Sequence, residues 1–335
     1  MERTKIGLLV AKLESTYNGS TTFAAASNSI AVANGSVNLA PEFDPQDRQI
    51  LDGRDAQAYP GEMALPRAKI SFRLEARGNR TDGTTADISK GAVAQALRID
   101  CLLRACDLTP TYTAETSTGA RDGNVVYKPT VPADNGESVA LQFYSGSKRH
   151  LLTGCKGTVK AVFEAGKCGL LDFDFMGIYN APADAALPGS IAFEETKPPL
   201  CIGNTLTLDS WTAPVCKKLE FDLGNQIVRR DDMLQATGVQ GFFVGTRATA
   251  GSVVIENVAE ATYPLHANLA AGNTKLLNYT LGSLTGNKLA VIFNYIRSKS
   301  LAYEDQGGIR NANLGFDVMR ATLGQAASEF ALYFS

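Results

Sequence analysis

The sequence is poor in the residues that most often carry chemistry. Among its 335 residues it has two histidines, His150 and His266, and one tryptophan, Trp211. The histidines lie outside any metal-ligand spacing, so we interpret both as packing or surface residues. The sequence has none of the motifs of serine hydrolases, P-loop proteins, zinc proteases or Rossmann dinucleotide-binding proteins. We therefore expect no catalytic centre, no cofactor and no metal site.

An excess of positive charge is also missing. The 32 Lys and Arg residues are balanced by 34 Asp and Glu, which gives a formal net charge of −2. Since proteins hold a phosphate backbone with a basic surface, tight general binding of nucleic acid is disfavoured. Charged residues make up 20% of the chain, below the usual share of about 25%. This composition is compatible with extensive subunit contacts, and equally with a β-rich protein that has many polar turns.

The cysteines do not form a recognisable framework. Six are present, at 101, 106, 155, 168, 201 and 216, and no two of them have the C-x-x-C spacing of a zinc or redox site. Their density is far below that of a disulfide scaffold, so we predict reduced thiols that act as small apolar fillers.

Long apolar runs are absent as well. No run approaches the 18 residues of a membrane span, and the run from Ile6 to Ala11 is too short for a signal peptide. We expect a protein that is made in the cytoplasm, is soluble there, and has no membrane partner.

A long β-hairpin from Arg149 to Pro182 is the strongest pattern in the sequence. Apolar and other residues alternate along both arms, which is the periodicity of strands. The residues that this pattern turns toward a core are Val159, Ala161, Phe163, Ala165, Leu171, Phe173 and Phe175. Gly166 and Gly169 lie where a hairpin turn or a bulge is needed. The segment therefore predicts two strands with one buried face and one mixed face.

Other segments of the first half predict further strands and one helix. Alternation predicts strands over 68–76 and 138–144. Apolar residues at helical spacing predict a helix over 89–106, with Asp100 on its solvent side. The proline-containing segment from Glu42 to Pro66 has neither period, and we expect a long ordered loop or an arm.

The second half follows the same order in outline. Its predicted elements are strands over 217–227 and 241–247, a short helix from Pro264 to Gly272, a strand over 275–281, and a hairpin of 288–296 with 313–319. The order strand, helix, strand, hairpin thus occurs twice, although residue-level similarity is poor, and the question of an internal duplication stays open.

These patterns predict a mainly β fold with a flanking α-helix, built from tandem β-sandwich or barrel domains. The expected N-terminal domain covers 1–190, followed by a linker over 191–212. A second β-rich domain follows over 213–335, and whether it is a divergent repeat of the first stays open.

Asp172 and Asp174 are the best catalytic candidates in a sequence with few. They lie two apart on a predicted strand, which places both on one face with Cα atoms roughly 6.5–7 Å apart. A glycoside hydrolase needs two carboxyl groups whose environments separate their pKa values. An open strand face offers no such difference, so an enzyme is disfavoured, and we interpret the pair as a solvated or pore-facing acidic row.

Three phrases of the first half resemble a known family. They are Leu102–Cys106 (LLRAC), His150–Gly157 (HLLTGCKG) and Phe175–Pro182 (FMGIYNAP), with VVYKP at 125–129 between the first two. In this order they resemble the N-terminal domain of major tail tube proteins of long, non-contractile-tailed bacteriophages. The segment LEFDLGNQIVRRDD at 219–232 is similar to the opening of the C-terminal part of the larger, two-domain members. Met176 departs from the pattern, because a small residue is expected there.

The resemblance implies a structural virion protein and not an enzyme. It implies a β-sandwich with one flanking helix that assembles into hexameric rings, whose sheets join into an inner barrel and which stack into a tube for DNA ejection. The implied partners are further copies of the chain, the tail terminator, and the tail-tip and tape-measure proteins. Synthesis in the host cytoplasm and a final location in the virion tail follow. The arm at 42–66 would contact a neighbouring subunit or ring.

DNA would pass such a wall as transient, unbound cargo. A neutral to acidic lining repels phosphates and gains nothing from counterion release. Glu164, Asp172 and Asp174 are the candidate lumen-facing residues, and Lys160 on the same face argues against them. A tail-tip or baseplate protein that binds a receptor or glycan is the alternative function, although the aromatic residues do not cluster as a binding module would require.

Overall fold

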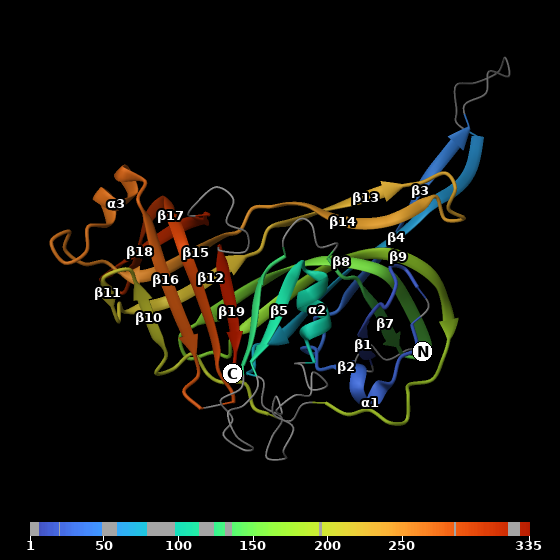
Figure 1. The fold of residues 1–335 in the computed structure, drawn as a ribbon, viewed down its shortest axis with the longest axis horizontal. Coiled ribbons are helices and arrows are strands. Elements are labelled where there is room, and N and C mark those ends of the chain that lie inside the picture. Colours follow the sequence, from blue (N-terminus) through green and yellow to red (C-terminus); the bar gives the residue numbers. More distant parts are fainter. Residues whose placement is uncertain are drawn as a thin grey trace.

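The chain folds mainly into β-strands. The computed structural model describes residues 7–19, 21–48, 59–78, 98–113, 124–130, 136–193, 196–284, 286–320 and 329–335. Most of them belong to antiparallel strands, and short helices flank the sheets (Figure 1). The prediction of a mainly β fold with a flanking α-helix is therefore confirmed.

The elements fall into two successive groups. The first group is β1 (Gly7–Leu13), α1 (Ala25–Asn28), β2 (Ser29–Ile30), β3 (Asn38–Arg48), β4 (Tyr59–Glu75), α2 (Asp100–Ala105), β5 (Leu108–Thr113), β6 (Asn124–Pro129), β7 (Val139–Ser145), β8 (Lys148–Glu164) and β9 (Leu170–Asp184). The second group is β10 (Thr205–Leu208), β11 (Trp211–Thr212), β12 (Cys216–Asp222), β13 (Asn225–Asp231), β14 (Val239–Arg247), β15 (Ala250–Glu256), α3 (Leu265–Ala271), β16 (Thr274–Leu281), β17 (Leu289–Gln306), β18 (Ile309–Val318) and β19 (Phe330–Phe334).

The strand pairings of the first group recur in the second. In the first, β1 pairs with β2 and β7, β4 with β3 and β9, and β8 with β7 and β9. In the second, β10 pairs with β11 and β16, β15 with β12 and β18, and β17 with β16 and β18. Along the chain, α2 lies between β4 and β7, and α3 lies between the matching strands β15 and β16. We refer to β1–β9 as the first repeat and to β10–β18 as the second repeat.

One sheet runs through both repeats. The far half of β8 pairs on one side with β9 and on the other with β12, so the strand order is β3-β4-β9-β8-β12-β15-β18-β17. The backbone bonds that flank the β8–β12 pairing run from Ala165 N to Lys217 O at 3.0 Å and from Leu223 N to Val159 O at 3.1 Å. The two repeats are thus joined by main-chain hydrogen bonds, which do not depend on side-chain identity.

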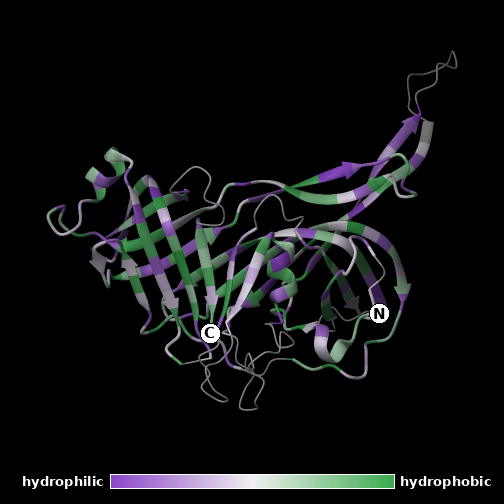
Figure 2. Ribbon diagram, in the orientation of Figure 1, coloured by the Kyte–Doolittle hydropathy of each residue, from purple (hydrophilic) through white to green (hydrophobic). Residues whose placement is uncertain are grey.

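The core lies between this sheet and a second layer of strands. In that layer β6, β19, β17, β16 and β10 are neighbours. Helix α2 packs against β1, β5 and β8. Phe163 of β8 meets Tyr279 with ring centroids 4.9 Å apart, and Phe221 of β12 meets Phe293 at 5.1 Å. The alternation of apolar and polar residues along the strands is visible in Figure 2. Burial of one face in each strand explains the period of two.

The long hairpin predicted over 149–182 is confirmed as β8 and β9. All but one of the residues predicted to face inward are buried in the core. The buried ones are Val159, Ala161, Phe163, Leu171, Phe173 and Phe175. Ala165 is exposed, because β8 ends at Glu164 and Ala165 already belongs to the turn. The predicted strands over 68–76 and 138–144 are likewise confirmed, as the inner part of β4 and as β7.

The segment 42–66, expected to be a long ordered loop or an arm, is an arm built from strands. Its described residues belong to β3 and β4, which pair with each other and project beyond the body of the molecule (Figure 1). We call the part of this hairpin from 41 to 48 and from 59 to 66 the arm. Proline is tolerated because each strand of the arm has one open edge, since β4 pairs with β9 only from Arg67 onward. A missing N–H at an open edge interrupts no second ladder. Register shifts near Asp44 and Arg48 further disguise the strand period.

Several boundaries in the second half differ from those predicted. The predicted strand over 217–227 is two strands, because the chain turns at Gly224, whose φ is +64°. The predicted pairing of 288–296 with 313–319 is wrong for most of its length: Ile296 pairs with Val318, but the residues before it pair with β16 and β19. Since β17 is 18 residues long and serves two layers, its single apolar pattern hid a change of partner.

The predicted linker and the two predicted helices agree with the structure to different extents. Of the predicted linker 191–212, the part from Thr205 forms β10 and β11 within the second repeat. Helix α3 lies between Pro264 and Gly272 as predicted, and Gly272 adopts the left-handed conformation that commonly ends a helix. For the predicted helix over 89–106, α2 accounts for 100–105, and 89–97 lie outside the described residues.

Candidate functional surface

The outward face of the long sheet carries the three predicted lumen residues. Asp172 and Asp174 project from β9, and Glu164 ends the neighbouring strand β8. All three side chains lie on the face opposite the buried aromatics, together with Lys160. We call the outward residues of β4, β9, β8, β12, β15 and β18 the polar face.

Each of the three carboxylates has a basic partner on this face. Arg73 of β4 is directly opposite Asp172 and donates from Nε at 2.5 Å and from Nη2 at 2.9 Å. Lys69, on the same strand, lies diagonally across from Asp174, with 3.7 Å between Nζ and Oδ1. Lys167 of the turn donates to Glu164 at 2.9 Å, and this hydrogen bond holds the pKa of Glu164 below its usual value. The expected acidic row is therefore a row of charge pairs.

The same pairing continues into the second repeat. Glu220 of β12 lies 3.5 Å from Lys160 across the junction and 2.9 Å from Lys218 on its own strand. Further on, Asp317 of β18 lies 3.3 Å from Lys299 and 3.8 Å from Arg297. Opposite charges on adjacent strands stabilise a sheet by roughly 0.2–1 kcal/mol per pair. Their larger effect here is to cancel the field of the face.

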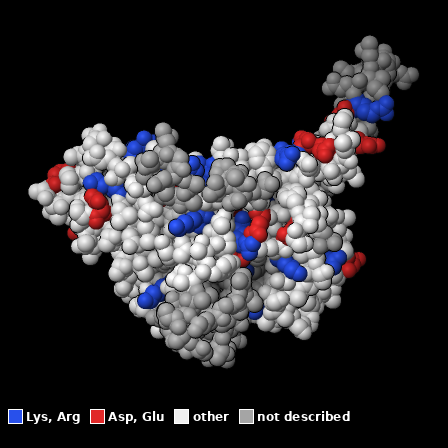
Figure 3. All heavy atoms as spheres, viewed as in Figure 1, with Lys and Arg blue, Asp and Glu red and all other residues white. Residues whose placement is uncertain are grey.

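Charges of one sign do not gather on the visible surface either. In Figure 3 the Lys, Arg, Asp and Glu residues are scattered or lie in small mixed clusters, with acidic and basic residues side by side on the arm. A surface of this kind neither concentrates nor repels a polyanion strongly.

The geometry does not favour the glycosidase interpretation of Asp172 and Asp174. Their side chains are 29% and 47% exposed, and each is engaged by its own cation. A general acid of this class requires an environment that keeps one carboxyl protonated. Neither Asp172 nor Asp174 lies in an enclosed apolar pocket of that kind.

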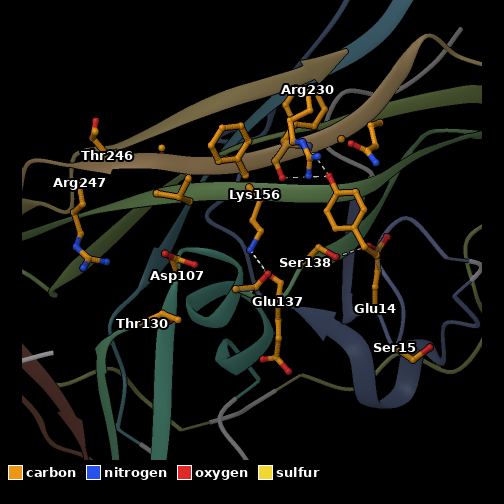
Figure 4. Close-up of a pocket in the computed structure, with 18 of the residues that line it drawn as sticks. Glu14, Ser15, Asp107, Thr130, Glu137, Ser138, Lys156, Arg230, Thr246 and Arg247 are labelled. Atoms are coloured by element: carbon orange, nitrogen blue, oxygen red, sulfur yellow. Dashed lines mark hydrogen bonds between the residues drawn. The ribbon is translucent and has the colours of Figure 1, made fainter. Parts of the chain in front are cut away.

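A polar cavity of about 780 Å³ lies beneath β14 (Figure 4). It is near the point where the chain passes from β12, which pairs with β8, into β13. Lys156 of β8 points into it and donates to the carbonyl of Gly136 and, at 2.7 Å, to that of Glu137. Burial lowers the pKa of Lys156, and burial raises that of the neighbouring Asp107.

The groups around this cavity hold the chain together. Glu14 is buried and accepts from Ser138 Oγ at 2.6 Å, Gly154 N at 2.8 Å and Asn18 N at 2.9 Å. The Tyr17 hydroxyl accepts from Phe242 N at 2.5 Å and lies 3.1 Å from the Gly154 carbonyl. These bonds fix β14 of the second repeat to β8 of the first. We interpret the cavity as a structural joint.

Asp100 corrects another expectation from the sequence. Predicted on the solvent side of a helix, it is only 6% exposed. It accepts hydrogen bonds from Tyr127 at 2.6 Å, Tyr112 at 3.0 Å and Arg104 at 3.2 Å. A buried carboxylate is tolerated because hydrogen bonds and a guanidinium replace its water.

The remaining candidates have packing roles. His150 Nδ1 lies 2.8 Å from the Tyr179 hydroxyl, and His266 Nε2 lies 2.5 Å from that of Tyr303. Trp211 packs on Tyr263 with ring centroids 5.0 Å apart. All six cysteines are free thiols. Within the described residues, no group of three or more His, Cys, Asp and Glu side chains is placed to hold a metal ion.

The sequence alone did not identify the basic partners of these carboxylates, although the strand that carries them has a recognisable pattern. Lys69 and Arg73 alternate outward on their strand just as Asp172 and Asp174 do on theirs. Arg73 and Asp172 are 99 positions apart in the sequence, and nothing in the sequence indicated that their two strands lie side by side.

Comparisons with known proteins add no relative to this geometry. The sequence matches no known family when compared with family models, and no curated protein matches it. In the part of the chain that the structure describes, no helix has both the length and the apolar character needed to cross a bilayer.

Proposed function

We propose that this chain is a major tail tube subunit of a long-tailed bacteriophage, which assembles into stacked rings that form the conduit for DNA ejection. The observation that carries the proposal is the sheet shared by both repeats, with one apolar face in the core and one charge-paired polar face. The three sequence phrases quoted above are consistent with the same family.

The electrostatics of the polar face suit a wall along which DNA slides. A protein that neutralises phosphates with unpaired Lys and Arg holds DNA through counterion release. On the polar face, Lys69, Arg73 and Lys160 are engaged by carboxylates, so little of that gain is left. Glu164, Asp172 and Asp174 would then line the lumen as members of charge pairs.

The two repeats bear on the composition of a ring. The resemblance implies hexameric rings. A ring of six repeats needs three chains, whereas a ring of six chains would hold twelve repeats. Native mass spectrometry of detached rings distinguishes these cases, because their masses are three or six times the chain mass of 35.6 kDa.

The remaining parts of the proposal follow from the tube. The subunit would be a structural protein without catalytic activity or cofactor, located in the virion tail. Its partners would be other copies of itself, the tail terminator, and the tail-tip and tape-measure proteins, with DNA as cargo that is not retained.

Negative-stain electron microscopy of the purified protein over a concentration series tests the proposal. We expect rings or tubes of uniform diameter at high concentration. Dispersed particles at every concentration, also in the presence of a tail-tip complex as initiator, would contradict it and favour a receptor- or glycan-binding role at the tail tip.

A further inference from the structure

We propose that copies of this chain join head to tail, by antiparallel pairing of the far half of β17 in one copy with β3 in the next. The inference rests on the proposed function, because it names the contact through which tube subunits would meet. Its evidence is the junction that the chain already makes between its own repeats.

The in-chain junction is a template with one unused counterpart. In it, the far half of β8 pairs with β12. The strand that matches β8 in the second repeat is β17, and the strand that matches β12 in the first repeat is β3. Within the described residues, β3 pairs only with β4, and residues 298–306 of β17 pair only with β18. Each chain therefore makes one such junction and presents both halves of another.

Shared irregularities fix how the repeats correspond. The β7–β8 pairing shifts register beside the pair Val139 and Cys155, and the β16–β17 pairing shifts beside Lys275 and Ile296. When these two shifts are aligned, Cys155 corresponds to Ile296. A later shift in β17 adds one residue, Lys299. Starting from Cys155 and Ile296, the other corresponding residues are found by counting along the paired strands. This procedure requires no sequence similarity between the repeats.

The correspondence then transfers the register of the junction. On the β8 side, Lys160 and Ala161 correspond to Ala302 and Tyr303. On the β12 side, the matching ladders lead from Phe221 to Leu39, and hence from the next residue, Asp222, to Ala40. Because Lys160 faces Asp222 and Ala161 faces Phe221 in the chain, the expected contacts between copies are Ala302 with Ala40 and Tyr303 with Leu39.

The side chains at these positions are compatible with the pairing, and the backbone differs from the in-chain junction at one place. Pro41 would face Leu301 as Leu223 faces Val159, but it has no N–H to donate. Ala302 and Ala40 are both small and would lie on the polar face. Tyr303 is 36% exposed in the single chain and Leu39 is partly buried. Pairing would cover both apolar groups on the core side of the sheet. Glu304 would lie opposite Asn38, whose amide can donate to a carboxylate.

The position of the arm agrees with this contact. The hairpin of β13 and β14 continues outward from β12 and β15, and it leans on the first repeat through Phe242 and Val239, which pack against Ile178. The arm continues outward from β3 and β4 in the same way, but it projects beyond the body of its own chain (Figure 1). Under the proposed pairing, the arm would extend over the second repeat of the neighbouring copy, as the hairpin of β13 and β14 extends over the first repeat within the chain.

A disulfide between copies tests the register. In an antiparallel ladder, side chains approach most closely at the pairs that do not exchange hydrogen bonds. The bond from Leu223 N to Val159 O marks a hydrogen-bonded pair, so the adjacent pair Lys160 and Asp222 is of the close kind. Ala302 and Ala40 would take the corresponding place, within the distance that a disulfide requires.

The experiment uses the full chain with Ala40→Cys and Ala302→Cys together, oxidised at a concentration at which it assembles. We expect a ladder of covalent oligomers beyond the dimer on a non-reducing gel, and no ladder from either single variant or from the parent chain with its native cysteines. Dimers formed efficiently by one single variant would overturn the inference in favour of a symmetric contact.

Other outcomes separate this inference from the proposed function. Rings or tubes seen by microscopy without any ladder would overturn the pairing and leave the tube function standing. A chain that remains monomeric under all conditions would overturn both.

A second pair of variants tests the edge of β17 without cysteines. Gln306 and Ile309 close a two-residue turn and so face each other across hydrogen bonds, which leaves the N–H of Asp305 pointing away from β18. Asp305→Pro removes that donor at the open edge, whereas the control Asp305→Ala keeps it. We expect the proline variant to retain the circular dichroism spectrum of the parent but to fail to assemble. Assembly equal to that of the alanine control would contradict the inference.

Discussion

Arg229 of β13 donates to Asp44 of the arm, with Nη1 2.8 Å from Oδ2, although the two residues are 185 positions apart. Arg67 of β4 donates to the other oxygen of the same carboxylate at 2.6 Å. The hydrogen bonds from Arg229 and Arg67 hold the pKa of Asp44 below its usual value. This carboxylate therefore ties the hairpin of β13 and β14 to the arm.

Replacing Asp44 should release this tie. In Asp44→Asn the two guanidiniums lose their shared anion, and we expect faster amide hydrogen exchange in β13 and in the arm with little change in the core strands. Hydrogen exchange measured by mass spectrometry checks this. Asp47→Asn is the matched control, since it makes the same change of charge on the same strand. Equal exchange in both variants would contradict a specific role for Asp44.

Acid should have the same effect on the parent chain. Since the pKa of Asp44 is lower in the folded state than the ordinary 3.8, its contribution is present above that value and is lost as the pH falls through the lower, folded one. We expect exchange in β13, relative to core strands, to rise below about pH 4 and Asp44→Asn to show no such rise.

Changing the charge of the polar face should alter the affinity of the proposed tube for DNA. Glu164, Asp172 and Asp174 changed together to Lys would leave their basic partners unpaired. We expect assembly to persist, because exposed pairs contribute only about 0–1 kcal/mol each, while salt-dependent DNA binding appears and ejection is impaired.

Filter binding at several salt concentrations and a phage infectivity assay check this prediction. A charge swap, Asp172→Arg with Arg73→Asp, is the control, because it keeps the pair and the net charge. Normal infectivity of the triple variant would show that these residues do not face the lumen.

Tyr127 should be important for stability because of its bond to Asp100. Tyr127→Phe removes a 2.6 Å hydrogen bond inside the core and leaves a buried carboxylate with one donor fewer. The expected loss in the free energy of unfolding is about 1–3 kcal/mol, measured by chemical denaturation. Tyr333→Phe, on β19, is the comparison variant and should lose markedly less.

Tyr17 should make the chain sensitive to alkali. Burial raises the pKa of Tyr17 to about 12 from 10.0, so the folded state favours the neutral phenol. The associated stability is complete below pH 10 and is lost as the pH rises through 12. An absorbance titration of Tyr17→Phe should lack one phenol that ionises near pH 12. Loss of one that ionises near pH 10 would contradict the burial of this hydroxyl.

How far the sequence leads depends on how local the signal is. The alternation around Phe173 and the Pro264 and Gly272 boundaries of α3 are local, and both predictions are confirmed. Asp100 was misassigned because its solvent-side position on a helix was inferred without the two tyrosines that cover it. The arm itself was expected, but its strands were missed because proline is read as a strand breaker, which fails at a sheet edge.

The polar face shows the same limit. The residues of β9 were correctly assigned to one side of a strand, but their charge balance depends on Arg73 and Lys69, which only the tertiary pairing brings close. Repetition of the fold was even less visible, since it is carried by ladder order and register shifts and hardly by residue identity.

The unequal chemistry of the two matching junctions has a consequence for timing. Inside the chain, Phe163 faces Leu219, an apolar pair buried when the polypeptide folds. At the corresponding place on the open edge, Asp305 stands where Phe163 does, exposed and charged. The first junction therefore forms as the chain folds, whereas the proposed second junction would form only when another copy arrives. Such a chain would complete its own fold before it polymerises.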